Sequence, residues 1–334
     1  MRIAVDAMGG DHAPQEIVKG AVEAARRLTG IERLYLVGRE DAVRAELARH
    51  GSVPPTIEIR NAGEVIAMNE APAQAVRRKK DSSISRAVDM VRDGEADAVV
   101  SAGNTGALVA GATLKLRTLE GVERPAIAVV MPTRHRPFVL IDAGANLDCS
   151  PYQLQQFAVM GQIYSREILG QASPVVGLLS IGGEDNKGNE LTREAFQLLK
   201  ATSLNFRGNV EGHDLFHDEI DVVVCDGFTG NVVLKTSESV ARVIGQWMKE
   251  EFKRNPVRVL GALLLRGAFG AMKQKMDPDV YGGAPLLGVN GVCIKAHGSS
   301  KAQAVFHAVR VAGESIGHRV THHIVDEIKK LNKA

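Results

Sequence analysis

Short runs of aliphatic and β-branched residues alternate along the chain with longer stretches in which apolar residues recur every three or four positions. The short runs are typical of buried β-strands, and the longer stretches are typical of amphipathic helices. Their regular alternation predicts an α/β fold with a largely parallel sheet. The predicted strands cover residues 3–5, 34–37, 56–59, 98–100, 126–130, 138–141, 175–180, 221–224 and 291–294.

The longer stretches predict helices, and no low-complexity linker or repeat of fixed period divides the chain. We therefore expect 1–334 to form one folded unit. Only the segment 253–276 fits neither the strand pattern nor the helix pattern. The predicted helices cover 14–27, 84–92, 151–169, 191–199, 230–252 and, at the end of the chain, about 301–331.

Four of the predicted strands run into a polar residue that is soon followed by glycine. In open α/β sheets, ligands bind beyond the carboxyl ends of the strands, where glycine lets the backbone approach a ligand and helix N-termini attract anions. We expect these loops to share one edge of the sheet and to bind phosphate, although glycine in such turns can also serve geometry alone. The candidate phosphate- or substrate-binding residues in them are Gly9, Gly10, Asn104, Thr105, Gly106, Asn146, Gly227 and Thr229.

Charge and cysteine content narrow the function classes. Of 334 residues, 41 are Lys or Arg and 39 are Asp or Glu, so the net charge of +2 does not indicate nucleic-acid binding. The 3 cysteines have no C-x-x-C spacing, so neither a disulfide framework nor a zinc site is indicated. No segment reaches the roughly 20 apolar residues of a membrane span, and the N-terminal apolar stretch is too short for a signal peptide. These features favour a cytoplasmic protein.

Several common catalytic motifs are absent. The first strand is not followed by G-x-G-x-x-G, and the sequence has neither a P-loop nor G-x-S-x-G. The pairs His213/His217 and His318/His322 have helical spacing but lack the glutamate of a zinc-peptidase helix, so we expect no metal site and no cofactor. Cys225 ends a strand, where a buried and inert thiol is more frequent than a nucleophile.

Seven segments in a fixed order indicate a family. They are DAMGGDHAP (6–14), SAGNTGAL (101–108), IDAGAN (141–146), GGEDNKGNEL (182–191), DGFTGNVVLK (226–235), YGGAPLLG (281–288) and IKAHGSS (294–300). Together they closely resemble the bacterial acyl-acyl-carrier-protein:phosphate acyltransferases of phospholipid synthesis, from residue 1 to about residue 328. The resemblance implies a three-layer α/β/α sandwich around a mixed, mostly parallel sheet, as in isocitrate and isopropylmalate dehydrogenases and phosphate acetyltransferase. It also implies a homodimer whose catalytic unit spans 1–334.

This resemblance further implies that inorganic phosphate attacks a fatty acyl thioester of acyl carrier protein and forms acyl phosphate. Phosphate is already an anionic nucleophile, so such a protein must hold it and stabilise the oxyanion, and needs no activated serine or cysteine. By resemblance, the catalytic residues lie in the loops around Lys187 and Asn231, and we select these two. Judged without the resemblance, Lys187 is a solvated loop lysine balanced by Glu184 and Asp185, and Asn231 is a helix cap.

The segment KAHGSS before the last helix supplies a second group of candidates. The candidate phosphate ligands in it are His297, Ser299 and, in addition, Lys295. Alternatively, the two serines only cap the helix that follows. Carboxylates would repel phosphate, so we expect three acidic residues to orient backbone or Lys187 instead. These residues are Asp6, Asp11 and Asp142.

Two surface features suggest partners. The run RRKK at 77–80 could dock the acidic acyl carrier protein, although such runs are usually only solvated. Segment 252–276 is Leu-rich at its centre and carries basic residues but no acid, which suits the surface of an anionic membrane or, alternatively, a dimer interface. The candidate membrane contacts are Leu260, Leu263, Leu264, Phe269 and the flanking Lys and Arg residues.

A long-chain acyl phosphate must reach a membrane acyltransferase, so we expect peripheral association with the inner face of the plasma membrane. A membrane glycerol-3-phosphate acyltransferase is then a further candidate partner. Two other function classes stay open. An NAD-dependent decarboxylating dehydrogenase would need a metal-binding aspartate cluster and an arginine clamp, and no such string is present. A membrane-associated scaffold built on 252–276 would leave the glycine-rich loops unexplained.

Overall fold

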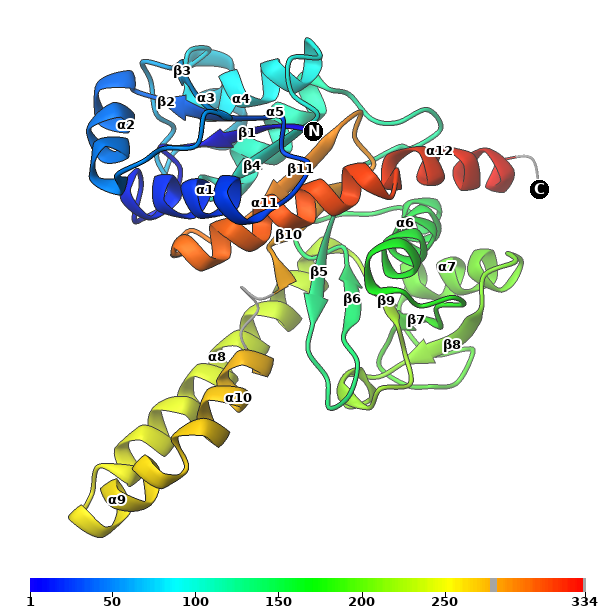
Figure 1. The fold of residues 1–334 in the computed structure, drawn as a ribbon. Coiled ribbons are helices and arrows are strands. Elements are labelled where there is room, and N and C mark those ends of the chain that lie inside the picture. Colours follow the sequence, from blue (N-terminus) through cyan, green and yellow to red (C-terminus); the bar gives the residue numbers. More distant parts are fainter. Residues whose placement is uncertain (277–280, 333–334) are drawn as a thin grey trace.

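The computed structural model describes residues 1–276 and 281–332. Within these residues, one 11-stranded sheet has the order β3-β2-β1-β4-β11-β10-β5-β6-β9-β7-β8 (Figure 1). The strands are β1 (Arg2–Asp6), β2 (Arg33–Gly38), β3 (Ile57–Asn61), β4 (Ala98–Ser101), β5 (Ala126–Met131), β6 (Phe138–Ile141), β7 (Val176–Leu179), β8 (Phe206–Val210), β9 (Val222–Val224), β10 (Ala284–Leu287) and β11 (Val292–Lys295).

The sheet is mixed, and its direction reverses near the middle. Neighbouring strands are antiparallel only at β11/β10, β10/β5 and β5/β6, and are parallel elsewhere. Strands β6, β9, β7 and β8 therefore run opposite to β1 to β4 and β11. The two halves are offset, however: Ile141 at the end of β6 is in register with Ala128, next to the pair Ile127/Leu286, and Pro285 is in register with Ile294. The carboxyl ends of β1, β4 and β11 and those of β6 and β9 therefore lie at nearly the same level of the sheet, although they approach it from opposite directions.

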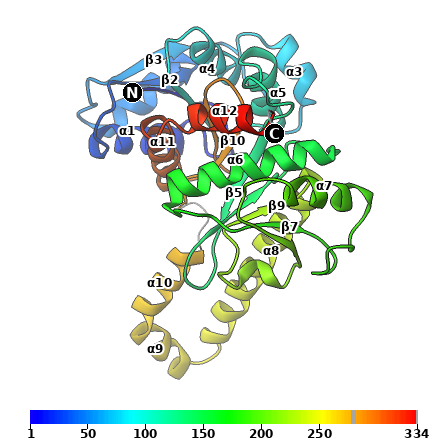
Figure 2. The same ribbon diagram turned by 90° about the vertical axis from the view of Figure 1, so that its right-hand side faces the viewer.

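Helices cover both faces of the sheet, so the expected three-layer α/β/α sandwich is confirmed (Figures 1 and 2). Two short 3₁₀ turns, Ala48–His50 and Asp214–Phe216, accompany them. The helices are α1 (Gln15–Arg27), α2 (Glu40–Leu47), α3 (Pro72–Arg78), α4 (Ser83–Arg92), α5 (Thr105–Lys115), α6 (Pro151–Leu169), α7 (Glu190–Lys200), α8 (Gly227–Phe252), α9 (Pro256–Leu264), α10 (Arg266–Met276), α11 (Ala302–Gly317) and α12 (Val320–Leu331).

Alternation along the strands sends side chains to two apolar layers. In β1, Ile3 and Val5 join the cluster formed with α1 and α11, whereas Ala4 between them joins the cluster under α3, α4 and α5. In the second half of the sheet, Val139 packs against α6 and α12. The period of two along each strand thus buries both faces of the sheet.

All the predicted strands are present, but the sequence pattern missed β8 and β10. Strand β8 contains the polar sequence FRGNV, and β10 contains Pro285, so neither resembles a buried strand. The single closing helix predicted over 301–331 is wrong. Arg319 adopts a left-handed conformation with φ of 51° and separates α11 from α12.

Helices α8, α9 and α10 form an arm that projects from the sandwich (Figures 1 and 2). Of the residues of α8, only Gly227 and Gly230 are buried. The ring of Phe252 in α8 meets the ring of Phe269 in α10 at a centroid distance of 4.9 Å, which joins the two helices of the arm. Among the described residues, no helix is both long and apolar enough to cross a membrane.

Helices α1 and α11 pack closely at Gly20. A Cβ atom at Gly20 would lie 2.4 Å from the carbonyl oxygen of Ala302, and this backbone atom has little room to move. We expect Gly20→Ala to destabilise the fold by about 1–3 kcal/mol, because it forces the helices apart. Gly245→Ala on α8 is the matched control, since nothing lies within 4 Å of a Cβ there, and it should stabilise by at most about 1 kcal/mol. Thermal unfolding followed by circular dichroism compares the two, and equal midpoints would contradict the prediction.

Candidate active site

The last residues of three neighbouring strands form a polar row on one face of the sheet. Asp6 of β1 is in register with Ser101 of β4, and Ser101 is in register with Lys295 of β11. Two positions earlier on the same strands, the side chains belong to the core under α3 to α5. These core residues are Ala4, Val99 and Cys293. The polar row therefore begins where the apolar core ends.

Asp6 is buried and organises its surroundings through hydrogen bonds. Its carboxylate accepts from the hydroxyl of Ser101 at 2.7 Å and from the backbone N–H of Met8 at 3.2 Å, and the side chain of Ser83 in α4 also bonds to it. Burial raises the pKa of Asp6 above its usual value, although these hydrogen bonds oppose the shift. As expected, Asp6 orients backbone and side chains around it.

Lys295 is the buried cation of the row. Its side chain is only 8% exposed, and its ammonium group donates to the carbonyl oxygen of Ala296. The pKa of Lys295 is lowered to about 8, chiefly by burial and also by the positive charge of Lys235 in α8, while Asp6 and Asp11 oppose the shift.

The loops that follow β1, β4 and β11 pack against one another. A Cβ at Gly9 would lie 2.6 Å from the backbone nitrogen of Gly103, so this contact requires glycine. Gly10 has a φ of 104°, a conformation that side chains other than glycine rarely adopt. The N–H of Asp11 donates to the carbonyl of Gly298 at 2.8 Å. Loop packing alone accounts for these glycines, and their contact with phosphate stays a prediction.

Asn104 joins α5 to the loop before α3. Its side-chain oxygen accepts from the N–H of Ala107 at 3.0 Å and caps α5, which begins at Thr105. Its amide group donates to three carbonyls, those of Ala67, Met68 and Glu70. A Cβ at Gly106 would lie 2.4 Å from the ring of Pro72, so α3 and α5 pack closely. Both ends of the Asn104 side chain are thus used within the fold.

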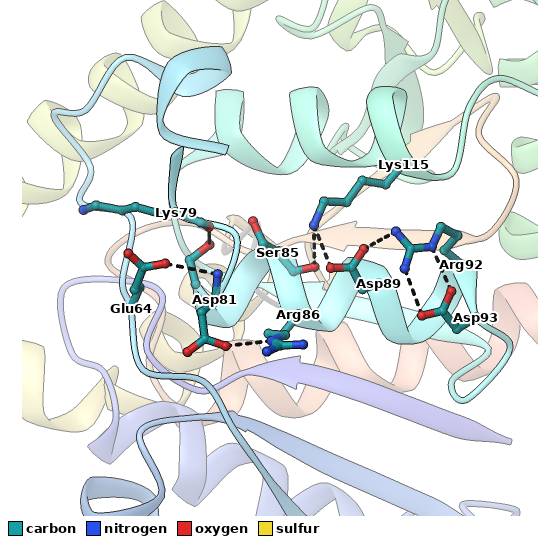
Figure 3. A network of polar contacts seen from close by, with 10 residues as sticks. Glu64, Lys79, Asp81, Ser85, Arg86, Asp89, Arg92, Asp93 and Lys115 are labelled. Carbon is teal, nitrogen blue, oxygen red and sulfur yellow. Dashed lines mark hydrogen bonds and ion pairs between the residues drawn. The ribbon is translucent and has the colours of Figure 1, made fainter. Parts of the chain in front are cut away.

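A network of ion pairs holds α4 beside α5 (Figure 3). Lys115 of α5 donates to the carbonyl of Ser85 and pairs with Asp89 at 2.7 Å. Asp89 also pairs with Arg92 at 2.6 Å, so one carboxylate links both helices. The network holds α4 against α5, and at the start of α4 the side chain of Ser83 bonds to the buried carboxylate of Asp6.

The segment after β11 differs from its expected geometry. The Nδ1 atom of His297 lies 2.8 Å from the hydroxyl oxygen of Ser299. The alternative that the serines cap α11 is wrong, because the N-cap residue of α11 is Lys301 and no side chain caps the helix there. The N–H of Ala302 donates instead to the carboxylate of Glu16 in α1 at 2.8 Å.

In the second half of the sheet, Asp142 organises the loop after β6. It is fully buried and accepts hydrogen bonds from the backbone N–H groups of four residues: Ile127, Gly144, Ala145 and Asn146. The side-chain amide of Asn146 donates to Asp142 and to the carbonyl of Pro125. Burial raises the pKa of Asp142. The expectation that Asp142 orients backbone is confirmed.

Helix α8 starts tightly against this loop. The carboxylate of Asp226 accepts from both the N–H and the hydroxyl of Thr229 at 2.8 Å, so Asp226 is the N-cap and the alternative role of Asn231 as cap is wrong. The N–H of Gly227 donates to the carbonyl of Asn146 at 2.8 Å. A Cβ at Gly230 would lie 1.9 Å from a backbone oxygen of the loop after β6. Asn231 is consequently held at the edge of this junction.

Lys187 lies in the loop after β7 and Asn231 lies early in α8, which follows β9, so both lie beyond the carboxyl ends of parallel neighbouring strands. Lys187 is half exposed, and its ammonium group lies 4.0 Å from the carboxylate of Glu184. Within residues 1–276 and 281–332, no hydrogen bond or ion pair joins Lys187 to Asn231. A hollow of about 430 Å³ lies beside Asn231. It is lined by Asn231, Val232, Lys235, Thr236, Ser239 and Val240.

None of the cysteines has the environment of a nucleophile. Burial raises the pKa of Cys149 to about 11 and that of Cys293 to about 12, and raises the pKa of Cys225 well above its usual value. The thiolate form is therefore scarce at neutral pH. In the part of the chain that the structure describes, no group of three or more His, Cys, Asp or Glu side chains could hold a metal ion.

Comparison with known proteins identifies the family. Residues 1–323 match the family model described as "Fatty acid synthesis protein". The chain is 51% identical over 331 residues to a phosphate acyltransferase of Pelotomaculum thermopropionicum, covering 99% of this chain and 96% of that protein. It is 50% identical over 337 residues to one of Akkermansia muciniphila, covering 99% and 97%. The chain belongs to the phosphate acyltransferase family. This membership favours acyl transfer over the dehydrogenase and scaffold alternatives.

Solved structures extend the comparison to the fold. A phosphotransacetylase from Streptococcus pyogenes aligns with a TM-score of 0.63 and 19% identity, covering 95% of this chain and 94% of that one. A 4-hydroxythreonine-4-phosphate dehydrogenase from Klebsiella pneumoniae aligns with a TM-score of 0.51 and 14% identity, covering 93% and 96%. The expected relation to both phosphate acetyltransferases and dehydrogenases is thus a relation of fold.

The sequence reasoning did not single out Lys235, which lines the same hollow as Asn231. Its position four residues after Asn231 was an available signal, because residues with this spacing share one face of a helix.

Proposed function

We propose that the protein transfers a fatty acyl group from a thioester of acyl carrier protein to inorganic phosphate. Membership of the phosphate acyltransferase family carries this proposal. In the step itself, a phosphate oxygen attacks the thioester carbonyl carbon and a C–O bond forms. The C–S bond then breaks, the thiolate leaves with the electron pair, and water supplies its proton. No atom is oxidised or reduced.

The protein contributes position and charge rather than a covalent intermediate. Lys187 stabilises the oxyanion or holds phosphate from its glycine-rich loop, where a half-exposed ammonium group is free to approach a ligand. Asn231 donates its side-chain amide to the oxyanion from the edge of the hollow on α8. The glycine-rich loops, together with His297 and Ser299, complete the binding of substrate. The raised pKa values of the cysteines support direct attack by phosphate.

Acyl carrier protein docks at the basic end of α3 in this proposal. Arg77, Arg78 and Lys80 are exposed, whereas Lys79 pairs with Glu70 at 2.6 Å. Helix α3 packs on α5 where the glycine-rich loop after β4 ends, so the docking surface adjoins the candidate site. Exposed charges of this kind mainly raise the rate of association. We also propose that the protein is a cytoplasmic homodimer.

The tip of the arm contacts the inner face of the plasma membrane in this proposal. Leu260, Leu263 and Leu264 are 59%, 64% and 80% exposed, so α9 offers apolar side chains to a surface. Phe269 is partly buried against Phe252 and serves the arm itself. Each basic residue near an anionic membrane adds about 1 kcal/mol, and burial of the leucines adds to this. Acyl phosphate would pass from here to a membrane glycerol-3-phosphate acyltransferase.

The proposed reaction is tested by trapping acyl phosphate as the hydroxamate after mixing the protein with acyl-acyl-carrier protein and phosphate. We expect Lys187→Ala to reduce its formation by at least about 10²-fold, as for the loss of one oxyanion contact. Asn231→Ala should have a similar effect. Lys200→Ala is the control. Lys200 is an exposed lysine at the end of α7, and it pairs with Asp185 in the loop that contains Lys187. Turnover near the wild-type rate in a folded Lys187→Ala protein would remove Lys187 from the site.

Direct attack by phosphate predicts that no cysteine is required. Replacing Cys149, Cys225 and Cys293 by alanine should leave acyl phosphate formation in place, with any loss attributable to reduced stability of the core. Mass spectrometry of the wild-type protein quenched during turnover should find no acyl adduct. An acyl group attached to any residue would overturn direct attack.

Membrane contact through α9 predicts that Leu263→Glu combined with Leu264→Glu releases the protein from phosphatidylglycerol vesicles in a flotation assay. Acyl transfer in solution should survive, because these residues lie at the far end of the arm. If 252–276 were instead a dimer interface, the two glutamates would break the dimer. Light scattering measures this, and a monomeric variant that still floats with vesicles would refute membrane contact through these leucines.

A further inference from the structure

Two lysines from distant parts of the sequence approach each other between the sandwich and the arm. Lys295 ends β11 and is buried, while Lys235 lies two turns into α8 and is 50% exposed. Asn231, one turn before Lys235, packs on Gly144, and the N–H of the adjacent Ala143 donates to the carbonyl of Ile127 in β5. Strand β5 pairs with β10, the strand beside Lys295, so the start of α8 lies close to the end of β11, and the charge of Lys235 acts on Lys295. Val233 and Leu234 of α8 pack on the same core cluster as Ala284, the register partner of Lys295 in β10. The approach of α8 to Lys295 is therefore built into the packing.

The cations are incompletely neutralised by the residues around them. Asp6 opposes the charge of Lys295, but burial favours the neutral form of this carboxylate. Lys235 pairs at 2.8 Å with Glu238, one turn further along α8, and exposed pairs of this kind contribute little. Like charges held close together repel each other, so an anion between them would be strongly favoured.

We propose that inorganic phosphate, the nucleophile of the proposed reaction, binds between the ammonium groups of Lys235 and Lys295. This inference rests on the proposed function and names the binding site of one of its substrates. A phosphate dianion matches the two positive charges, and each lysine donates charge-assisted hydrogen bonds to its oxygens. Ser101 and Asp6 fix the position of the row that contains Lys295.

The position of this site suits attack on a thioester held beside Asn231. Asn231 and Lys235 are four residues apart on α8, so they lie on one helix face and about 6 Å apart along the axis. Both line the hollow of about 430 Å³. Phosphate held at Lys235 and a carbonyl oxygen held at Asn231 would thus meet within one turn of the helix. The arrangement joins the first half of the sheet, through Lys295, to the second half, where α8 begins.

The alternative role for Lys295 is that of a buried counter-ion to Asp6. This role is structural and gives Lys235 no part, because Lys235 is half exposed and pairs with Glu238. The two interpretations therefore differ in what they predict for Lys235. They also differ in which KM changes, since a structural defect in the fold would not affect the KM for phosphate alone.

The experiment measures initial rates of acyl phosphate formation while phosphate and acyl-acyl-carrier protein are varied separately. We expect Lys235→Met and Lys295→Met to raise the KM for phosphate by about 10- to 100-fold, with the KM for the acyl carrier substrate unchanged. Lys249→Met, an exposed lysine near the end of the same helix, is the matched control and should behave as wild type. If Lys295→Met fails to fold, Lys235→Met carries the test, because its half-exposed position tolerates the change.

A direct measurement of binding uses thermal unfolding with added sodium phosphate, compared with sodium chloride at equal ionic strength. Phosphate should raise the unfolding midpoint of the wild type and of Lys249→Met, and this rise should be lost in Lys235→Met. An unchanged phosphate KM and midpoint shift in Lys235→Met would overturn the proposal. So would a rise in the KM for the acyl carrier substrate alone, since the lysines would then bind the carrier. Absence of acyl phosphate from the wild type would refute the proposed function itself.

Discussion

The reversal of strand direction at β10 and β5 is the constraint on which the rest of the molecule depends. A sheet of parallel strands alone would place every strand-to-helix loop at one edge. Here the direction reverses, but the two halves are offset, so that the carboxyl ends of β1, β4 and β11 and those of β6, β9 and β7 come to nearly the same level from opposite directions. The reversal thus brings loops from both halves to the middle of the sheet, where α8 begins.

In each half of the sheet, a buried carboxylate at a strand end accepts hydrogen bonds from the groups around it. Asp6 ends the core strand β1 and Asp142 directly follows β6, and both accept hydrogen bonds from donors around them. Glycines then let neighbouring loops approach to van der Waals distance, as Gly9 does at Gly103. A buried acceptor with many donors is costly to disturb, so these junctions are rigid. Side chains that can move toward a ligand are therefore the exposed ones at the borders of these junctions.

Much of the fold could be predicted from the sequence, because strand and helix periodicity is a local property. The pattern located the strands with aliphatic cores, but it missed β10, whose Pro285 is tolerated where the sheet reverses direction. Strand direction and the offset of the two halves depend on connections across the whole chain, so the pattern could not show that the four loops reach the middle of the sheet from opposite directions. Resemblance pointed to Lys187 and Asn231, whereas the place of Lys235 in the proposed phosphate site depends on the path of α8 and has no local signature.

The projecting arm has a consequence for folding and for variation among sequences. Helix α8 is 26 residues long, about 39 Å at 1.5 Å per residue, yet only its first two turns pack on the sandwich, through Gly227, Gly230, Val233 and Leu234. Its outer part, with α9 and α10, shares little core with the sheet and can unfold locally while the sheet stays intact. Amide hydrogens there exchange from such local openings, independently of global unfolding. Substitutions at the tip are consequently uncoupled from the stability of the catalytic body, so this surface is free to diverge.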